Sequence, residues 1–384
     1  MRLTADIGVA RNSKYKEELC GDAVQVVRTP GQTTVILSDG LGSGVKANIM
    51  STLTTKIASG LLQRAVPLEH VIATIADTLP VCRVRGLAYA TLSILQVQHD
   101  GKAMLYEYDS PPVHLFRKDL VIPLERKARI IHGKRILEST FQLQEGDMLL
   151  MVSDGVIHAG VGEAFDLGLG EDGLLHFLTS PCTTWPQAED MADFIIGLSS
   201  SCYHQKFGDD CTAVVLRIRP PRGVAVFTGP PLDPKRDDEM VRALMSLTTY
   251  KKIVCGGTSA SIVSRITGAE LETSLEYVDP RVPPIANMSG IDLVTEGVLT
   301  LNRCYELLRG VQDGGFFPRS QDGATLLAKE LWNAEEVHFL VGKSFNQAHA
   351  NIEELMQLAP RQYIITRLVD FLRKRSIRTE ISYF

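Results

Sequence analysis

The 384-residue chain lacks the features that mark membrane, secreted, zinc-binding and nucleic-acid-binding proteins. No stretch reaches 18 apolar residues, which argues against a transmembrane helix, and the N-terminus lacks the apolar core of a signal peptide. The seven cysteines are scattered, without a CxxC pair or a cluster at zinc-ligand spacing. A net charge of -5 gives no basis for binding DNA or a membrane surface. We therefore expect a cytoplasmic protein with reduced thiols that binds neither nucleic acid nor membrane.

Internal repeats and low-complexity tracts are also missing, but proline density marks a boundary near residue 220. The stretch 219–223 (RPPRG) ends a strand-like run, and 229–234 (GPPLDP) follows soon after. Prolines at this density stop regular structure. Because 384 residues exceed what one hydrophobic core comfortably supports, the sequence predicts two domains, residues 1–220 and residues 221–384.

The first domain is predicted to contain short strands around two consecutive helices. One helix is expected from Gly44, and a second is expected over Leu68–Thr78 with Pro67 at its start. The first helix should bury an apolar face that recurs every four residues: Val45, Ile49, Leu53, Ile57 and Leu61. Strands are predicted from β-branched and apolar runs at Ala23–Val27, Thr33–Leu37, Ala88–Gln96, Ala103–Tyr108, Val113–Arg117, Met148–Ser153 and Thr212–Ile218. This order favours an α/β sandwich of antiparallel sheets flanked by helices over a doubly wound parallel sheet.

The second domain has a different pattern, in which strands and helices alternate. Strands are predicted at Val224–Thr228, Lys252–Cys255, Val337–Val341 and Gln362–Thr366, and helices at Arg236–Thr248, Asp292–Arg309, Thr325–Trp332 and Ala348–Leu358. The alternation predicts an α/β domain with some parallel pairing. Its loop 255–261 (CGGTSAS) is either an anion-binding loop or a tight structural turn. We expect this domain to bind a regulatory ligand or a partner, or to form a homodimer.

Four aspartates lie at the edges of predicted strands in the first domain. Asp22 precedes one strand, Asp39 follows the next, Asp154 follows the apolar run 148–153, and Asp209 precedes the last strand. A strand is a rigid support, so an aspartate at its end has little positional freedom. One Ser-Asp-Gly sequence is a common turn, but two of them after matched apolar runs are harder to explain as turns.

Convergence of these carboxylates would create a metal site. Without compensation they would repel one another, and some would stay protonated. Divalent cations relieve that repulsion, and an all-oxygen ligand set favours Mg²⁺ or Mn²⁺ over zinc. The carbonyl of Gly40, directly after Asp39, could also reach an ion.

Four ordered motifs carry a family resemblance: GDAVQV (21–26), SDGLGSG (38–44), VSDGV (152–156) and GDDCTAVVLR (208–217). With the two helices that follow the second motif, they resemble the PPM-type metal-dependent protein phosphatases. Within that family the pattern is most similar to the stage II sporulation E (SpoIIE) branch, over residues 1–219.

The resemblance assigns roles to the motif residues. Asp22 and Asp39 would bind metals, with Asp39 bridging two ions and the Gly40 carbonyl as a further ligand. Asp154 and Asp209 would complete the shell of one ion. Asp210 would either contact a metal-bound water or brace its loop.

The resemblance also implies an activity. It is that of a serine/threonine phosphoprotein phosphatase with two Mn²⁺ or Mg²⁺ ions, a third ion also being compatible, in bacterial signalling. A hydroxide bridging the ions would attack the phosphorus in line. The phosphoprotein substrate would be a regulator of the anti-anti-sigma kind. Two departures from the family pattern, Ser43 and the loop 108–112 (YDSPP), bear on substrate preference more than on catalysis.

Three other interpretations remain open. The fold could be a catalytically inactive module for binding or sensing, or its substrate could be a small phosphometabolite. A cysteine phosphatase needs a Cys-x5-Arg loop, which Cys211 and Arg217 match in spacing. The residues between them are strand-like, however, and an extended strand would separate the two by roughly 20 Å.

Overall fold

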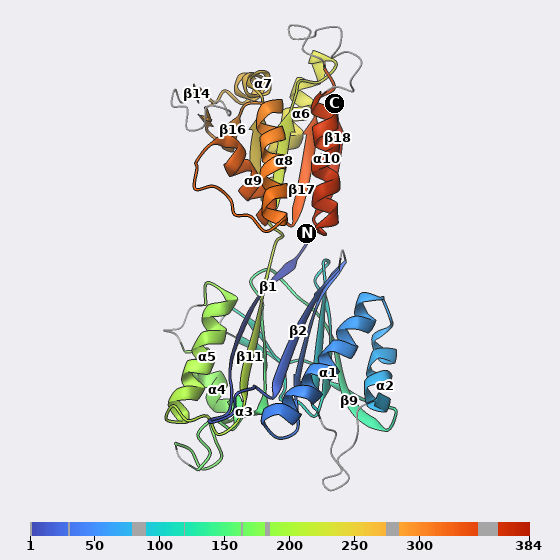
Figure 1. Cartoon of the computed structure of the whole chain (residues 1–384), viewed down its shortest axis with the longest axis vertical. Coiled ribbons are helices and arrows are strands. Elements are labelled where there is room, and N and C mark those ends of the chain that lie inside the picture. The colour runs from blue at the N-terminus through green and yellow to red at the C-terminus, as the bar shows by residue number, and fades with distance from the viewer. Residues whose placement is uncertain are drawn as a thin grey trace. The chain divides into compact units, whose positions relative to one another are not determined.

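The computed structural model describes residues 2–29, 31–78, 90–118, 120–162, 164–180, 185–273, 284–344 and 360–384. The chain divides into two compact units, Met1–Pro220 and Pro221–Phe384, and the division falls within the proline-rich stretch (Figure 1). No helix in the described ranges combines the length and the apolar character needed to cross a membrane.

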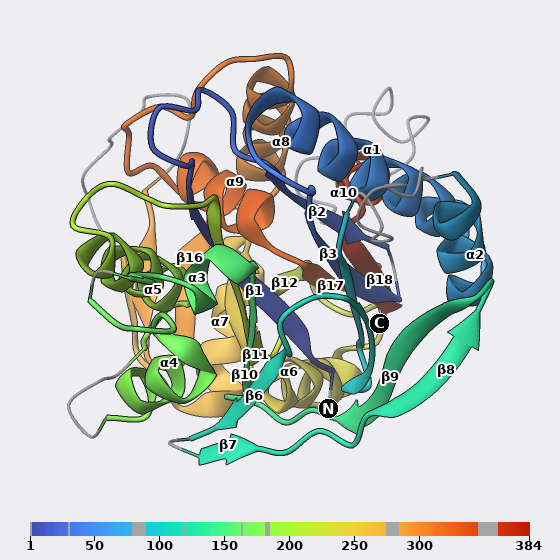
Figure 2. The ribbon, with the colours of Figure 1, turned by 90° about the horizontal axis from the view of Figure 1, so that it is seen from below.

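The N-terminal unit is built from two antiparallel sheets. In its described residues, the five-stranded sheet has the spatial order β1 (Thr4–Asn12), β11 (Cys211–Arg219), β10 (Met148–Val152), β6 (His114–Arg117) and β7 (Leu120–Ile122). The six-stranded sheet has the order β2 (Asp22–Arg28), β3 (Gln32–Asp39), β4 (Leu92–Gln98), β5 (Lys102–Tyr108), β9 (Lys134–Gln142) and β8 (Lys127–Ile131). Helices α1 (Gly44–Gln63) and α2 (Leu68–Thr78) lie outside the six-stranded sheet, and α3 (Asp154–Ile157), α4 (Gly170–Leu178) and α5 (Ala188–Cys202) lie outside the other (Figure 2).

Side chains that alternate along the strands point either into a core between the two sheets or into one of two outer cores, between a sheet and its helices. In β3, Val35 and Leu37 join the core between the sheets, whereas Ile36 packs beneath α1 and α2. In β10, Leu149 points to the inner core and Leu150 to the core beneath α3, α4 and α5. Because β10 is covered on both faces, all five of its residues are apolar and buried. The α/β sandwich of antiparallel sheets expected from the sequence is confirmed.

Helix α1 begins at Gly44 as predicted, but the predicted buried face is only partly correct: Ile57 and Leu61 pack against the core beneath the helix, whereas the first three residues of that face do not. Val45 and Ile49 are 60% and 56% exposed, and Leu53 is also exposed. The buried residues are instead mostly small or hydroxyl-bearing: Gly44, Ala47, Ser51, Thr54, Thr55, Ala58, Ser59 and Leu62. Their hydroxyls donate to carbonyls of the helix itself, as from Thr54 to Met50 at 2.7 Å, so this face can be buried without unpaired polar groups. Small side chains also let α1 approach β2 and β3 closely.

Substitution of a small buried residue of α1 should therefore cost more stability than substitution of one of its exposed apolar residues. Ala47→Leu should lower the free energy of unfolding by about 1–3 kcal/mol, because Ala47 is fully buried and a larger side chain overpacks the contact. Ile49→Ser should change it by less than about 0.5 kcal/mol, because Ile49 lies in solvent. Urea unfolding measures both, and a larger cost for Ile49→Ser would contradict the observed orientation of the helix.

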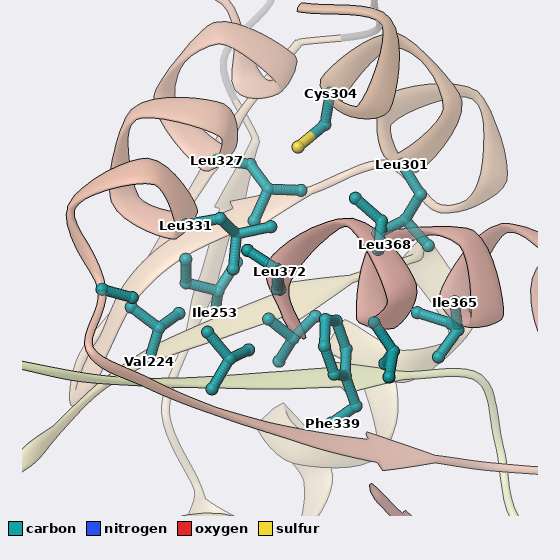
Figure 3. Packing of buried hydrophobic residues seen from close by; sticks show 14 of the residues in the cluster. Val224, Ile253, Leu301, Cys304, Leu327, Leu331, Phe339, Ile365, Leu368 and Leu372 are labelled. Carbon is teal, nitrogen blue, oxygen red and sulfur yellow. The ribbon is translucent and has the colours of Figure 1, made fainter. Parts of the chain in front are cut away.

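The C-terminal unit is an α/β sheet with helices on both faces. Its described strands have the order β14 (Leu271–Thr273), β15 (Ala286–Met288), β16 (Ile291–Thr295), β13 (Tyr250–Cys255), β12 (Gly223–Thr228), β17 (Glu336–Val341) and β18 (Arg378–Tyr383). The five strands from β16 to β18 pair in parallel, as expected. One face packs against α6 (Asp237–Ser246) and α7 (Gly257–Thr267); the other packs against α8 (Val298–Gln312), α9 (Gly323–Asn333) and α10 (Pro360–Lys374) (Figure 3).

Two predictions of secondary structure in this unit differ from the structure. The helix predicted over Asp292–Arg309 is correct only from Val298, where α8 begins, because Ile291–Thr295 form strand β16. The strand predicted at Gln362–Thr366 lies inside α10, because Ile364, Leu368 and Leu372 recur every four residues and are buried against the sheet. The helix predicted at Ala348–Leu358 lies outside the described residues.

Candidate metal centre

The four predicted aspartates lie at strand ends that come from both sheets of the N-terminal unit. Asp22 begins β2 and Asp39 ends β3, where the two residues are directly opposite each other in the antiparallel register. Asp154 follows β10 and Asp209 precedes β11, and these two strands are neighbours in the other sheet. The carboxylates act on one another electrostatically, because Asp154 raises the pKa values of Asp22, Asp39 and Asp209.

Asp22 is the most deeply buried member of this group. It is 1% exposed, and neither carboxylate oxygen has a hydrogen-bond partner among the described residues. Burial raises its pKa well above the ordinary value, and Asp210 and Asp154 add to the effect. The hydroxyls of Thr212 and Ser153 lie close enough to oppose that rise, without reaching hydrogen-bond geometry.

Asp39 and Asp209 are half-buried and face the same group of acids. Burial raises the pKa of Asp39, and the charges of Asp22, Asp154 and Asp209 add to it. Burial also raises the pKa of Asp209, and the positive charge of Lys14 partly offsets this rise. Asp154 is half-buried as well, so three of the carboxylates have access to solvent while Asp22 closes the inner end of the group.

The serine of each Ser-Asp-Gly motif ties its aspartate to a neighbouring segment. The Ser38 hydroxyl donates to the carbonyl of Thr91 at 2.6 Å, and the Thr91 hydroxyl accepts from the amide of Asp39 at 3.2 Å. The Ser153 hydroxyl accepts from the amide of Thr212 at 2.9 Å. The repeated serine before aspartate is therefore the sequence signal for these bracing contacts.

Asp210 is held in a way that distinguishes it from Asp209. It is buried, its Oδ1 accepts from the amide of Lys14 at 2.9 Å, and its own amide donates to the Asp209 carboxylate at 2.9 Å. Its Oδ2 is buried without a hydrogen-bond partner among the described residues. Asp210 thus braces the loop between α5 and β11, and it also leaves one free oxygen on the side of Asp22.

Gly40 and Gly155, the glycines that follow the two aspartates, are required for close packing. The amide of Gly40 donates to the carbonyl of Gly21 at 3.2 Å, and a Cβ on Gly40 would overlap the backbone of Ala47 in α1. A Cβ on Gly155 would overlap the carbonyl of Asp210. The Gly155 carbonyl also accepts from the Tyr203 hydroxyl at 2.9 Å. Both glycines bring the acid-bearing segments closer than any side chain would allow.

Gly155→Ala should lower the free energy of unfolding by about 1–3 kcal/mol and also reduce metal affinity, because the loop bearing Asp210 must move. The matched control is Gly197→Ala on the exposed side of α5, where a Cβ meets open space. That change should stabilise the protein by about 0.4–1 kcal/mol. Thermal unfolding and metal titration of both variants test the contrast. Equal effects at the two sites would show that the close contact at Gly155 is unimportant.

A divalent cation fits the donors of this group, although no complete site is formed. Among the described residues, no three His, Cys, Asp or Glu side chains are arranged closely enough to hold an ion as they stand. Nevertheless, the buried oxygens of Asp22 and Asp210 lack partners, and such groups are normally hydrogen-bonded or bound to a metal. The donors are carboxylate oxygens, which suit Mg²⁺ or Mn²⁺.

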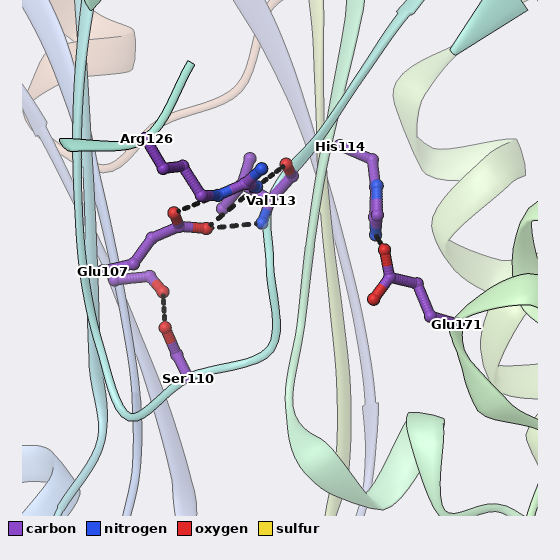
Figure 4. A network of polar contacts seen from close by, with 7 residues as sticks. Glu107, Ser110, Val113, His114, Arg126 and Glu171 are labelled. Atoms are coloured by element: carbon purple, nitrogen blue, oxygen red, sulfur yellow. Dashed lines mark hydrogen bonds and ion pairs between the residues drawn. The ribbon is translucent and has the colours of Figure 1, made fainter. Parts of the chain in front are cut away.

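A network of polar contacts holds the loop between β5 and β6 (Figure 4). Glu107 accepts from the amide of Val113 at 2.6 Å and from Arg126 at 2.8 Å, and the hydroxyls of Ser110 and Ser93 lie 2.7 Å apart. Burial lowers the pKa of neighbouring His114 to about 4, so this histidine is neutral near pH 7. The network fixes the shape of the loop that departs from the family pattern.

A cysteine-phosphatase centre is excluded by the position of Cys211. Cys211 and Arg217 both lie in β11, so the extended strand holds them apart. Burial also raises the pKa of the Cys211 thiol, and the surrounding aspartates add to the effect. The thiol therefore stays protonated and is a poor nucleophile.

Comparison with known proteins identifies the domain that carries these acids. Residues 29–219 match the family model of stage II sporulation protein E (SpoIIE). The N-terminal unit is a SpoIIE-like phosphatase domain. It is 27% identical over 218 residues to stage II sporulation protein E of Bacillus subtilis (strain 168), which covers 55% of this chain and 25% of the relative. The same protein of Priestia megaterium is 26% identical over 156 residues, covering 39% of this chain and 26% of the relative.

The fold of the SpoIIE-like domain has also been seen in a solved structure. That structure contains the PP2C phosphatase domain and a fragment of the regulatory domain of the cell fate determinant SpoIIE from Bacillus subtilis. It matches with a TM-score of 0.50 and 22% identity, over 57% of this chain and 64% of that one. The chain spans about a quarter of the length of the curated relatives it matches.

Proposed function

We propose that the SpoIIE-like domain is a metal-dependent phosphatase that hydrolyses phosphoserine and phosphothreonine in a partner protein. The observation that supports this most directly is the Asp22 carboxylate, which is buried with both oxygens unpaired and lies close enough to Asp210, Asp154 and Asp39 to interact with their charges. A carboxylate in such surroundings is unfavourable unless a cation compensates its charge. In a domain of this family, that need is best explained by metal-dependent phosphate chemistry.

Residues of both sheets would share the metal ions. Asp22, Asp39, the Gly40 carbonyl, Asp154 and Asp209 would hold two Mn²⁺ or Mg²⁺ ions, and a third ion is compatible with the same group of acids. When bound, the ions would lower the pKa of water and neutralise the charge of the phosphate.

The rest of the site would position the ligands and attract the substrate. The hydrogen bonds of Ser38 and Ser153 hold two of the acid-bearing strand ends in place. Lys14 lies near enough to Asp209 to affect its pKa, so its ammonium group would draw a phosphate towards the acids. Positioning and electrostatic attraction provide most of the catalysis of phosphate transfer.

The substrate and the cellular setting follow as part of the same proposal. The curated relatives are bacterial sporulation proteins, which favours a bacterial signalling role. The resemblance of the four motifs to the SpoIIE branch is the basis for a phosphoprotein regulator of the anti-anti-sigma kind as substrate. All five cysteines in the described ranges are unpaired, which favours a reducing, cytoplasmic location. The C-terminal unit would regulate the domain by binding a ligand or a partner, or by forming a homodimer.

Hydrolysis assays on the purified full chain test the proposal. We expect turnover of a phosphoserine peptide and of p-nitrophenyl phosphate with Mn²⁺ or Mg²⁺, and none with EDTA. Absence of turnover in folded, metal-bound protein would contradict the proposal and favour an inactive binding module. One observation favours the inactive binding module: the described residues do not form a complete metal site.

A small phosphometabolite as substrate is tested by removing residues 221–384. The N-terminal unit has its own hydrophobic cores and should fold without them. Retained turnover of the peptide would show that the second unit is not needed to hold the substrate.

A further inference from the structure

The C-terminal unit contains a doubly wound sheet with a defined point of reversal. The chain runs from β12 outward through β13 and β16, and then crosses to β17 and β18 on the other side of β12. All five strands are parallel, so their carboxyl ends lie along one edge. In sheets of this type, ligands bind outside that edge, where the strand order reverses.

Two helices begin at this edge from a pair of glycines in contact. Gly256 precedes α7 and Gly297 precedes α8, and a Cβ on Gly297 would lie 3.5 Å from the Cα of Gly256. Gly256 has a φ of 119°, which other residues rarely adopt. Among the described residues, no side chain caps the first turn of either helix, and the Glu296 carboxylate accepts a hydrogen bond from the amide of Gly297, which precedes α8. The free amides of two converging helix ends favour an anion.

Two buried hydroxyls at the same edge have no hydrogen-bond partner among the described residues. Thr300, in the first turn of α8, is fully buried, and its Cα–Cβ bond tilts towards the start of the helix. Thr228, the last residue of β12, is fully buried and lies on the same face as Val224 and Val226. That face packs against α8 and α10 (Figure 3). A buried hydroxyl without a partner is unfavourable, so the pair points to a bound group.

A basic side chain without a carboxylate partner stands next to Thr228. Arg361, the second residue of α10, lies against Gly229, where a Cβ would overlap its guanidinium. Its Nη1 makes only long hydrogen bonds, to the carbonyls of Gly342 at 3.4 Å and Ser344 at 3.3 Å. No described carboxylate pairs with it, and it is half-buried. A guanidinium in such surroundings favours an anion with several oxygens.

These groups are linked along the sheet. Thr228 pairs in register with Cys255, which immediately precedes Gly256, and Gly256 contacts Gly297 at the start of α8. Arg361, Thr228, the two glycines and Thr300 therefore lie along one stretch of the carboxyl edge. We propose that this stretch, between the first turn of α8 and Arg361, binds the phosphate group of a small phosphorylated ligand. The site belongs to the C-terminal unit and does not depend on the activity proposed for the SpoIIE-like domain.

The chemistry of the edge favours a phosphate over a dinucleotide of the nicotinamide type. Helix amides, hydroxyls and a guanidinium together suit the tetrahedral oxygens of a phosphate. Dinucleotide sites carry an acid after the second strand to bind the ribose, and here Cys255 ends that strand, followed by two glycines. The ligand is therefore a phosphomonoester or a nucleotide, held mainly through its phosphate.

Calorimetric titration of the full chain with inorganic phosphate and with ADP tests the site. EDTA is present throughout, so the acidic centre of the other unit has no cation with which to bind phosphate. We expect binding that Thr300→Val and Arg361→Gln each weaken by about tenfold. Arg309→Gln, at the opposite end of α8, is the matched control and should leave the affinity unchanged. Tighter binding of ADP identifies a nucleotide as the ligand, and equal affinities identify the phosphate alone.

Two outcomes would overturn the site: no binding of either probe, or the same affinity in Thr300→Val, Arg361→Gln and Arg309→Gln. Thermal unfolding of the unliganded protein supplies an independent measurement. Valine has the shape of threonine without the hydroxyl, so Thr300→Val should raise the midpoint of unfolding if that hydroxyl is unpaired. A lower midpoint would show that the hydroxyl already has a partner in the free protein, which removes the reason for a ligand.

Discussion

Asp39→Asn is expected to abolish metal-dependent hydrolysis and at the same time to stabilise the metal-free protein at neutral pH. The loss of activity should exceed about 100-fold, because even residues behind the ligands of a metal typically matter by 10–100-fold. The gain in the free energy of unfolding should be about 1–2 kcal/mol, because burial and three neighbouring acids force Asp39 to take up a proton on folding at neutral pH, and the neutral amide does not have this cost. An increase in stability together with a loss of function is the pattern expected of a ligand group.

The matched control for this prediction is Asp193→Asn, which neutralises an exposed aspartate of α5 in the same unit. It should leave both turnover and stability within experimental error. Peptide hydrolysis with Mn²⁺ and urea unfolding in EDTA measure the two effects. If Asp39→Asn keeps its turnover, Asp39 is not a metal ligand; if it loses stability in EDTA, the carboxylate is not repelled by its neighbours.

Divalent cations are expected to stabilise the N-terminal unit, and to do so more strongly at pH 8 than at pH 5.5. The pKa values of Asp22 and Asp39 are raised in the folded state, so the folded protein binds protons more tightly than the unfolded chain. Without metal, its stability should therefore fall as the pH rises above the ordinary aspartate value near 4 through neutrality. Metal ions replace those protons, so their benefit grows with pH.

Thermal unfolding in EDTA and in Mn²⁺, across this pH range, measures the coupling. At a Mn²⁺ concentration about 100 times the dissociation constant, the gain should be about 2.7 kcal/mol. The control is the Asp39→Asn variant, in which the pH dependence and the effect of metal should both shrink. Stability that increases with pH in EDTA would contradict the proposed crowding of carboxylates.

Much of the architecture could be predicted because the local patterns were strong. Helix α2 occupies Leu68–Thr78 as predicted, with Pro67 just before it, since proline is suited to the start of a helix. Buried strands such as β10 were recognised from continuous apolar runs. Strand β1 was missed; its burial alternates only partly, and its pairing with β11 joins residues about 200 positions apart in the sequence. No local pattern reports such a pairing.

The incorrect predictions for α1 and α10 have a common physical origin. Periodicity in α1 identified a helix but not the face that would be buried, because the sheet beneath it accepts small residues whose hydroxyls bond within the helix. In α10, the β-branched residues around Ile364 favoured a strand locally, but burial against the sheet at helical spacing prevailed. Propensity is a weak preference of well under 1 kcal/mol per residue, and packing readily overrides it.

The sequence alone singled out the four aspartates as candidate metal ligands and placed each at a strand end. It could do so because local composition marks the strand ends and the glycines near them. Only the tertiary structure decided that strand ends from two different sheets face one another, that Asp22 is buried with its oxygens unpaired, and that Asp210 braces the loop while leaving one oxygen free. The reason is physical. The positions of strand ends follow from short-range pattern, whereas the burial and the electrostatic environment of a carboxylate depend on segments that only folding brings together.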